Sequence, residues 1–209
     1  MNLIMAEPLV EQVLQKIDQV RHLYHRLVLL VGPSGSGKTS ALQGVAARAS
    51  APLLNVNLEL SCRMLDLTER QRALQVPRLL QDVCASSVER HATNVERRAS
   101  CVDRHGSEVL LLDNVEILFD VKLKQDPLRL LQGLSRNRTI VAAWPGRITG
   151  ASEPRHTSET VDARRTPHDA GRYLTYAVPD HPEYRRYLIR DLVIVDALSV
   201  GRHASGGQA

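Results

Sequence analysis

The chain has 209 residues and a formal net charge of +4, and this length suits one domain of ordinary size with a single apolar core. One Trp, one Phe and five Tyr are present, which argues against a protein that binds single strands by stacking bases on aromatic rings. The Arg residues are spread along the chain. The mild basic excess therefore predicts a solvated surface, with at most weak or indirect contact with DNA.

The cysteines give no sign of a metal site or a disulfide framework. Cys62, Cys84 and Cys101 lack metal-ligand spacing, and three cysteines cannot all pair within one chain. We expect reduced thiols, as in the cytoplasm. No apolar run approaches the ~20 residues that cross a bilayer, and Met1–Glu7 lacks the basic and apolar regions of a signal peptide. The sequence predicts a cytoplasmic location without a membrane segment.

An amphipathic helix is expected over residues 1–25. From Leu9 to Tyr24 the apolar residues recur at helical spacing and form one stripe, with polar side chains facing water. Such a helix packs either on the edge of a core or against a partner subunit. Residues 26–200 are then expected to form the main domain, and residues 201–209 a flexible tail.

Beyond this helix, apolar runs of strand length alternate with helical segments, which is typical of an α/β fold with right-handed crossovers. Pro77 should break or kink the longest helical region, because proline removes a backbone donor and clashes with the preceding turn. Strands are expected at Leu27–Val31, Leu53–Leu58, Val109–Leu112, Thr139–Trp144 and Tyr173–Val178, and helices at Lys38–Ala49, Cys62–Arg98, Asp126–Leu134 and from His181 onward. The sequence predicts a mainly parallel five-stranded sheet flanked by helices.

The segment between the first strand and the next helix carries the chemistry. It reads Gly32-Pro33-Ser34-Gly35-Ser36-Gly37-Lys38-Thr39 and fits the pattern G-x-x-x-x-G-K-[ST] at every fixed position. Glycines let the backbone curl so that N–H groups converge on phosphate oxygens, and the helix N-terminus adds its positive dipole end. We expect Lys38 to bridge the β- and γ-phosphates, Thr39 to ligate Mg²⁺, and Ser40 to complete the nucleotide-binding segment. This is a P-loop for ATP and Mg²⁺.

The third strand supplies a candidate metal ligand. Four apolar residues are followed by Asp113 at the carboxyl end of the strand, which is the edge where open α/β sheets bind ligands. We expect Asp113 to hold Mg²⁺ directly or through a water, as in other P-loop enzymes. The alternative is an ordinary Asp that begins a turn.

Hydrolysis also needs a group that orients or deprotonates the attacking water. Many P-loop ATPases place a Glu directly after the strand Asp, but this chain has Asn114 there. Glu116 lies on the same turn as Asp113, and Glu59 follows the second strand, a position used by recombinase-type ATPases. We favour Glu116 over Glu59 as the catalytic partner of Lys38, although either Glu also suits a helix start.

Candidates for a sensor of the γ-phosphate and for an arginine finger stay open. The fourth strand ends in Ala143-Trp144-Pro145-Gly146, without a polar side chain, so Arg147 or Thr149 is left for the sensor role. Arg136 and Arg138 precede that strand and belong at the opposite edge of the sheet, from which only a neighbouring subunit's site is within reach.

A polar segment separates the fourth strand from the fifth. Residues 147–172 are rich in Ser, Thr, Pro, Arg and Asp and hold almost no large apolar side chains. That composition predicts a long loop, an inserted lid or local disorder. Arg164, Arg165 and Arg172 lie here, where arginine fingers often occur, and a solvated loop explains them equally well.

Several stretches outside the P-loop resemble one family. They are Asn55–Ser61, Leu112–Phe119, Gln125–Gln132, Ser135–Thr139 and Asp180–Tyr184. Together they are similar to BrxF, the small P-loop ATPase of type 3 BREX phage-defence systems, over roughly residues 25–146 and again near 173–190. The resemblance implies a RecA/AAA-like ATPase core, ATP hydrolysis in support of a multi-protein complex, self-association, and contact with other BREX components.

Two other functions share these motifs. A small-molecule or nucleotide kinase uses the same P-loop, with residues 147–172 as an Arg-bearing lid. A nucleotide-gated adaptor binds ATP without efficient hydrolysis, which the absence of Glu at position 114 allows. A GTPase is disfavoured because no N-K-x-D motif follows the P-loop.

Overall fold

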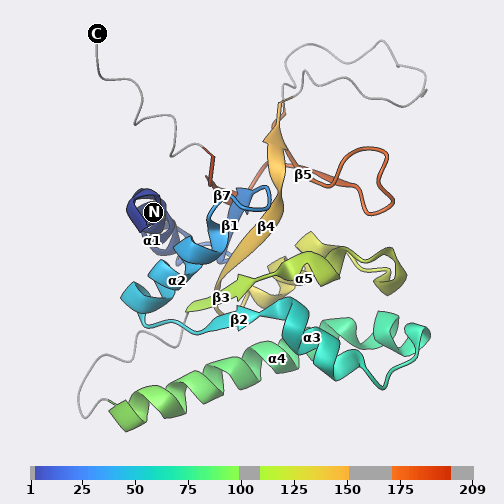
Figure 1. Cartoon of the computed structure of the whole chain (residues 1–209), viewed down its shortest axis with the longest axis horizontal. Coiled ribbons are helices and arrows are strands. Elements are labelled where there is room, and N and C mark those ends of the chain that lie inside the picture. Colours follow the sequence, from blue (N-terminus) through green and yellow to red (C-terminus); the bar gives the residue numbers. More distant parts are fainter. Residues whose placement is uncertain (1–2, 99–108, 151–170, 199–209) are drawn as a thin grey trace.

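The computed structural model describes residues 3–98, 109–150 and 171–198 (Figure 1). The helices are α1 (Leu3–Val20), α2 (Lys38–Ala49), α3 (Val56–Met64), α4 (Glu69–Arg98) and α5 (Pro127–Leu134), with short 3₁₀ helices η2 (Val115–Phe119) and η3 (Val121–Leu123). The strands are β1 (Leu27–Gly32), β2 (Leu53–Asn55), β3 (Val109–Asp113), β4 (Thr139–Thr149), β5 (Tyr173–Tyr176), β6 (Arg185–Leu188) and β7 (Val193–Asp196). No helix in these ranges is long and apolar enough to cross a membrane.

Five parallel strands form the main sheet in the order β2-β3-β4-β1-β7. Strand β4 lies between β1 and β3, with Leu27 opposite Ile140 and Val109 opposite Thr139. The second half of β4 runs on past the sheet and pairs antiparallel with β5, which pairs in turn with β6. The predicted α/β fold with a parallel five-stranded sheet flanked by helices is confirmed.

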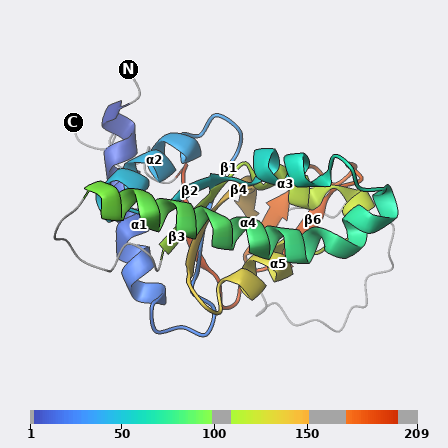
Figure 2. The same ribbon diagram turned by 90° about the horizontal axis from the view of Figure 1, so that it is seen from below.

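Both faces of the sheet are covered, so each central strand is apolar throughout. Alternate residues of β1 face opposite ways: Leu29 packs in the core with α3, α4 and α5, whereas Leu30 packs in the core with α1 and α2. Figure 2 shows α4 crossing in front of the sheet on the first of these sides. The buried side chains of α1 share one core with α2 and β1.

Helix α1 ends earlier than the apolar spacing predicts. The prediction extended to Tyr24, but the helix stops at Val20, and the Leu23 and Tyr24 side chains are 46% and 71% exposed. The Leu23 N–H donates to the Val20 carbonyl in a turn that leads the chain into β1. Helical spacing therefore continues past the point where the backbone has already turned.

The second strand is shorter than predicted. The range Leu53–Leu58 was expected to be extended, but β2 stops at Asn55 and α3 begins at Val56. The Asn55 side chain accepts the Leu58 N–H at 3.0 Å, so this residue is the N-cap of α3. The second half of the prediction is wrong because a capping Asn ends the strand.

Helix α4 runs through Pro77 without a break, so the predicted break is wrong. Proline at position 77 leaves the Ala73 carbonyl, four residues earlier, without its helical N–H partner. The Gln125 side chain, in the loop after η3, donates its Nε2 to that carbonyl at 2.7 Å. Buried Val76 and Leu80 on either side of the proline anchor the helix to the core.

The C-terminal part differs most from the prediction. Between His181 and Leu198, the last residue that the structure describes, the chain forms β6 and then β7 and no helix. The fifth parallel strand is β7, beside β1, and the predicted fifth strand is β5, which runs antiparallel to the end of β4. Val193, Ile194 and Val195 are β-branched and favour a strand. Residues 151–170 and 199–209, where an insertion and a tail were expected, lie outside the described residues.

The contact between Gln125 and Ala73 can be measured as a coupling. We expect Gln125→Ala to lower the free energy of unfolding by about 1–3 kcal/mol, because it leaves a part-buried carbonyl without a donor. In a Pro77→Ala background the helix regains its own N–H at position 77, so the same change should cost less. Urea unfolding of the four proteins measures the difference. Equal losses in both backgrounds would contradict this account of Pro77.

Candidate nucleotide-binding site

The P-loop joins the carboxyl end of β1 to the N-terminus of α2. Gly35 and Gly37 have φ values of +78° and +82°, in the left-handed region that side chains with a Cβ rarely adopt. Gly37 is the N-cap of α2, and Lys38 is its first residue. The glycines thus form the curl expected of a phosphate-binding loop, with a helix N-terminus directly behind it.

Gly32 is closely packed. A Cβ at this position would collide with the Ser36 hydroxyl and meet the Ala197 side chain. The Ala197 N–H donates to the Val31 carbonyl at 2.8 Å, so the residue after β7 is hydrogen-bonded to the carboxyl end of β1. The start of the P-loop is therefore held between its own Ser36 and the end of the neighbouring strand.

The Lys38 ammonium folds back over the loop. Its Nζ donates to the carbonyls of Gly32 and Pro33, both at 2.7 Å. Burial lowers the pKa of Lys38, and the negative charges of Glu116 and Asp113 act in the opposite direction. The two acids expected from the third strand and its turn therefore lie within electrostatic reach of the P-loop lysine.

Asp113 ends β3 and is 6% exposed. Strand β3 is separated from β1 by β4, and the carboxyl ends of all three strands lie at the same edge of the sheet. The structure therefore places the P-loop and Asp113 on one edge, one strand apart.

Asn114 explains how the chain turns after β3. It has a φ of +51°, a left-handed conformation that Asn tolerates better than most residues. Its carbonyl accepts the Asn57 N–H from α3 at 3.0 Å. After this reversal Val115 is buried and Glu116 is exposed on η2. The residue that occupies the usual Glu position thus has a backbone role, and an exposed carboxylate, that of Glu116, comes two residues later.

The donor set fits Mg-ATP. The Ser36 Oγ is buried and has no hydrogen-bond partner among the residues that the structure describes. Thr39 is exposed in the first turn of α2, and Asp113 offers a carboxylate. Hydroxyl and carboxylate oxygens are the ligands that Mg²⁺ prefers, and Lys38 supplies a cation for phosphate.

Residues 28–138 match the family model described as ATPase family associated with various cellular activities (AAA). This range is more than half of the chain and contains the P-loop, Asp113 and Glu116. The chain belongs to the AAA ATPase family. It is a P-loop nucleoside triphosphate hydrolase. No curated protein or solved structure matches the chain.

Glu59, the second candidate for a catalytic acid in this AAA ATPase, is paired with an arginine of α4. Glu59 lies in the first turn of α3 and forms a salt bridge with Arg90 of α4, with 3.6 Å between Oε1 and Nη2. The charges that act on Lys38 come from Glu116 and Asp113. Of the two glutamates, Glu116 is the one that the structure brings to the P-loop.

A buried indole lies in the middle of the fourth strand of this AAA ATPase. Trp144 is fully buried, and its Nε1 donates to the Thr175 carbonyl at 3.1 Å. Arg147 and Thr149, the sensor candidates, lie further on, where β4 pairs with β5. The Arg147 carbonyl accepts the Thr175 hydroxyl at 3.1 Å, and its side chain is exposed.

The candidate finger arginines lie in different places. Arg136 and Arg138 precede β4 at the amino edge of the sheet, and the Arg136 guanidinium lies 5.5 Å from the Tyr24 ring centroid. The P-loop is at the opposite edge of the same subunit. Arg164 and Arg165 lie outside the described residues.

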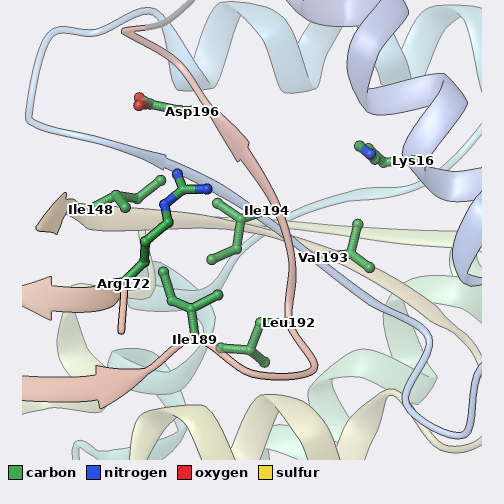
Figure 3. A pocket seen from close by; sticks show the side chains of 8 residues that line it. All are labelled: Lys16, Ile148, Arg172, Ile189, Leu192, Val193, Ile194 and Asp196. Carbon is green, nitrogen blue, oxygen red and sulfur yellow. The ribbon is translucent and has the colours of Figure 1, made fainter. Parts of the chain in front are cut away.

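Sequence reasoning missed a hollow beside β7 (Figure 3). It has a volume of about 260 Å³ and is lined by Lys16, Ile148, Arg172, Ile189, Leu192, Val193, Ile194 and Asp196. In Figure 3 the Arg172 side chain extends from the apolar floor toward the side where Asp196 lies. Asp196 is opposite Val31, so this end of the hollow adjoins the start of the P-loop. The sequence did not reveal this hollow because the residues of β7 were expected to form a helix.

Backbone conformation at the P-loop can be tested with two glycines. We expect Gly37→Ala to lower the free energy of unfolding by roughly 1–2 kcal/mol, because alanine is strained at a left-handed φ. Gly133→Ala is the matched control in α5, where a Cβ meets nothing within 4 Å; it should raise stability by up to about 1 kcal/mol. Urea unfolding measures both. A Gly37→Ala protein as stable as the wild type would contradict the strain.

Proposed function

We propose that this AAA ATPase binds Mg-ATP at residues 32–40 and hydrolyses it with Glu116 as the group that activates water. One observation carries the assignment: the P-loop that leads from β1 into α2 and the turn with Asp113 and Glu116 after β3 lie at the same carboxyl edge of the parallel sheet, one strand apart. The charges of both acids act on the Lys38 ammonium. A cation for the phosphates, a carboxylate for the metal and a second carboxylate for water are thereby gathered at one edge of the sheet.

In this proposal, backbone N–H groups of residues 32–37 surround the phosphates, with Ser40 completing the segment behind them. The buried Ser36 hydroxyl supplies a further donor. Lys38 exchanges its loop carbonyls for β- and γ-phosphate oxygens, which are stronger acceptors because they are charged. Thr39 and Asp113 hold Mg²⁺, which when bound neutralises charge on the phosphates. The remaining chemistry is positioning and proton transfer by the chain itself.

Glu116 is the better placed of the two glutamates for the water. It follows Asp113 on one turn and is exposed, whereas Glu59 is engaged by Arg90. A carboxylate free of an ion-pair partner is the better proton acceptor.

The absence of Glu at position 114 favours one alternative, a nucleotide-gated adaptor with little hydrolysis. A kinase would instead need a bound acceptor for the phosphoryl group.

For the biological setting, we propose a cytoplasmic ATPase of a bacterial anti-phage complex of the BREX type. The resemblance of residues 55–61, 112–119 and 125–132 to BrxF supports this setting. AAA ATPases often oligomerise, so self-association and contacts with other complex components are included, with DNA reached only indirectly or weakly. In this layout, residues 26–200 form the ATPase domain, residues 1–25 an N-terminal segment that contains α1, and the polar stretch between β4 and β5 an insertion or lid. A methyltransferase gene beside this one would support the setting.

The P-loop assignment predicts the behaviour of two lysine variants. Lys38→Ala should lower ATP turnover at least ~100-fold, because a charge that stabilises the transferring phosphoryl group is lost. Lys16→Ala, an exposed lysine on α1 that donates to Gln19, should retain turnover within about twofold. Phosphate release without an added acceptor measures both and separates hydrolysis from a kinase. Wild-type turnover by Lys38→Ala would remove the assignment.

The two glutamates can be ranked by the same assay. Glu116→Gln should keep Mg-ATP binding and lower kcat by roughly 10²–10⁴-fold, which is the usual contribution of a general base. Glu59→Gln should alter kcat less than about threefold, since it breaks a surface ion pair. The reverse order would move the role to Glu59. If both variants and the wild type bind Mg-ATP without measurable turnover, the adaptor alternative holds.

A further inference from the structure

Aromatic side chains gather beside the turn that carries Glu116. The chain has one Phe and one Trp, and both are here: Phe119 on η2 and Trp144 near the end of the parallel part of β4. Their ring centroids are 4.9 Å apart in an edge-to-face arrangement. Tyr176 of β5 stacks on Phe119 with centroids 3.7 Å apart and an interplanar angle of 24°. In a chain with so few aromatic residues, three of them are therefore concentrated beside this one turn.

The stack lies on the side of η2 that bears Glu116. Glu116 and Phe119 are three residues apart in a 3₁₀ helix, where side chains at positions i and i+3 eclipse one another. The Tyr176 ring on Phe119 therefore faces the side of the turn from which the Glu116 carboxylate projects. Burial raises the pKa of Tyr176 to about 12, and the negative charges of Glu183 and Glu116 also contribute, which is consistent with that proximity.

Tyr176 is itself held from two directions. Its hydroxyl donates to Glu183 Oε2 at 3.3 Å, within the chain segment that joins β5 to β6. The preceding residue, Thr175, has its carbonyl bound by the Trp144 indole and its hydroxyl bound to the Arg147 carbonyl. The β5–β6 hairpin is thus fixed to β4, which is the strand between the P-loop strand and the Asp113 strand.

From this geometry we infer that Tyr176 is a positioning residue for ATP hydrolysis: its ring, stacked on Phe119, holds η2 so that Glu116 faces the phosphates. The inference rests on the proposed role of Glu116. Tyr176 does not touch the nucleotide in this scheme, so its loss should slow turnover without weakening binding. Removing the ring allows η2 to shift about Asn114, and a displaced base is a poor catalyst.

The experiment compares four substitutions in the full-length chain. Tyr176→Leu should lower kcat about three- to tenfold while KM for Mg-ATP stays within about twofold, the signature of an interaction that matters only in the transition state. Tyr176→Phe keeps the ring and should retain at least about half of kcat. Phe119→Leu should behave like Tyr176→Leu. Tyr173→Leu is the matched control at the other end of β5, where the ring packs under Arg186; its kcat should be near wild type.

Coupling separates positioning from general damage. If the two rings act as one unit, the Tyr176→Leu/Phe119→Leu double variant should lose little more than either single variant, rather than the product of the two losses. The inference would be overturned if the loss of kcat in the double variant equalled the product of the two single losses. An unchanged kcat in Tyr176→Leu, or an equal loss in Tyr176→Phe, would also overturn it. A parallel rise in KM, or an equal defect in Tyr173→Leu, would also overturn it, since either indicates a general structural effect.

Failure of the underlying assignment looks different. Normal turnover by Glu116→Gln removes the catalytic role of Glu116 and with it the group that Tyr176 is said to position. An inactive Glu116→Gln beside a fully active Tyr176→Leu leaves the catalytic role standing and removes only the inference. Thermal unfolding of each variant confirms that the compared proteins are folded.

Discussion

The site depends on one backbone constraint: the chain must curl through left-handed conformations between β1 and α2 while both ends of the curl stay fixed. Gly35 and Gly37 make the curl possible. The first turn of α2 fixes one end, and the packing of Gly32 against Ser36 and Ala197 fixes the other. A loop held in this way presents its N–H groups in a set direction before any ligand arrives, which reduces the entropy lost on binding.

Sheet order then determines which side chains meet this loop. Because β4 separates β1 from β3, Asp113 stands one strand away from the P-loop, and the turn after it has room to bring Glu116 to the same edge. The left-handed Asn114 and its bond to Asn57 set the path of that turn. On the other side of β1, the hydrogen bond from Ala197 to Val31 holds the end of β7 beside the P-loop. Backbone bonds set the path of the turn that carries the candidate acids, and the Tyr176 and Phe119 rings pack beside it.

Sequence patterns predicted the parts of the molecule whose cause is local. A glycine-rich motif after a fully apolar run indicated the P-loop, and Asp126-Pro127 indicated the start of α5, where the Asp126 side chain accepts the Arg129 N–H. The patterns were wrong where tertiary contacts decide. Where α4 continues through Pro77, the unpaired Ala73 carbonyl accepts a hydrogen bond from a glutamine about fifty residues further along the chain, a contact that periodicity cannot reveal.

The C-terminal region shows the same limit. Its tyrosines and leucines suit either a helix or strands, and the neighbouring strands settle the outcome: β7 completes the sheet beside β1, and β5 extends β4. The aromatic cluster was equally hidden, because Phe119, Trp144 and Tyr176 are far apart in sequence and meet only through the pairing of β4 with β5. Pairing between distant segments carries no local signature.

Strand β4 belongs to both the parallel sheet and the antiparallel hairpin, and this has a consequence for how such a chain can diversify. Thr149 and Tyr173 face each other across the ladder, so the polar stretch between them leaves and re-enters the fold at adjacent points. Its length can change at little cost in loop-closure entropy without shifting the register of either strand. A change in the length of this stretch is therefore expected to leave the phosphate-binding end of the sheet undisturbed.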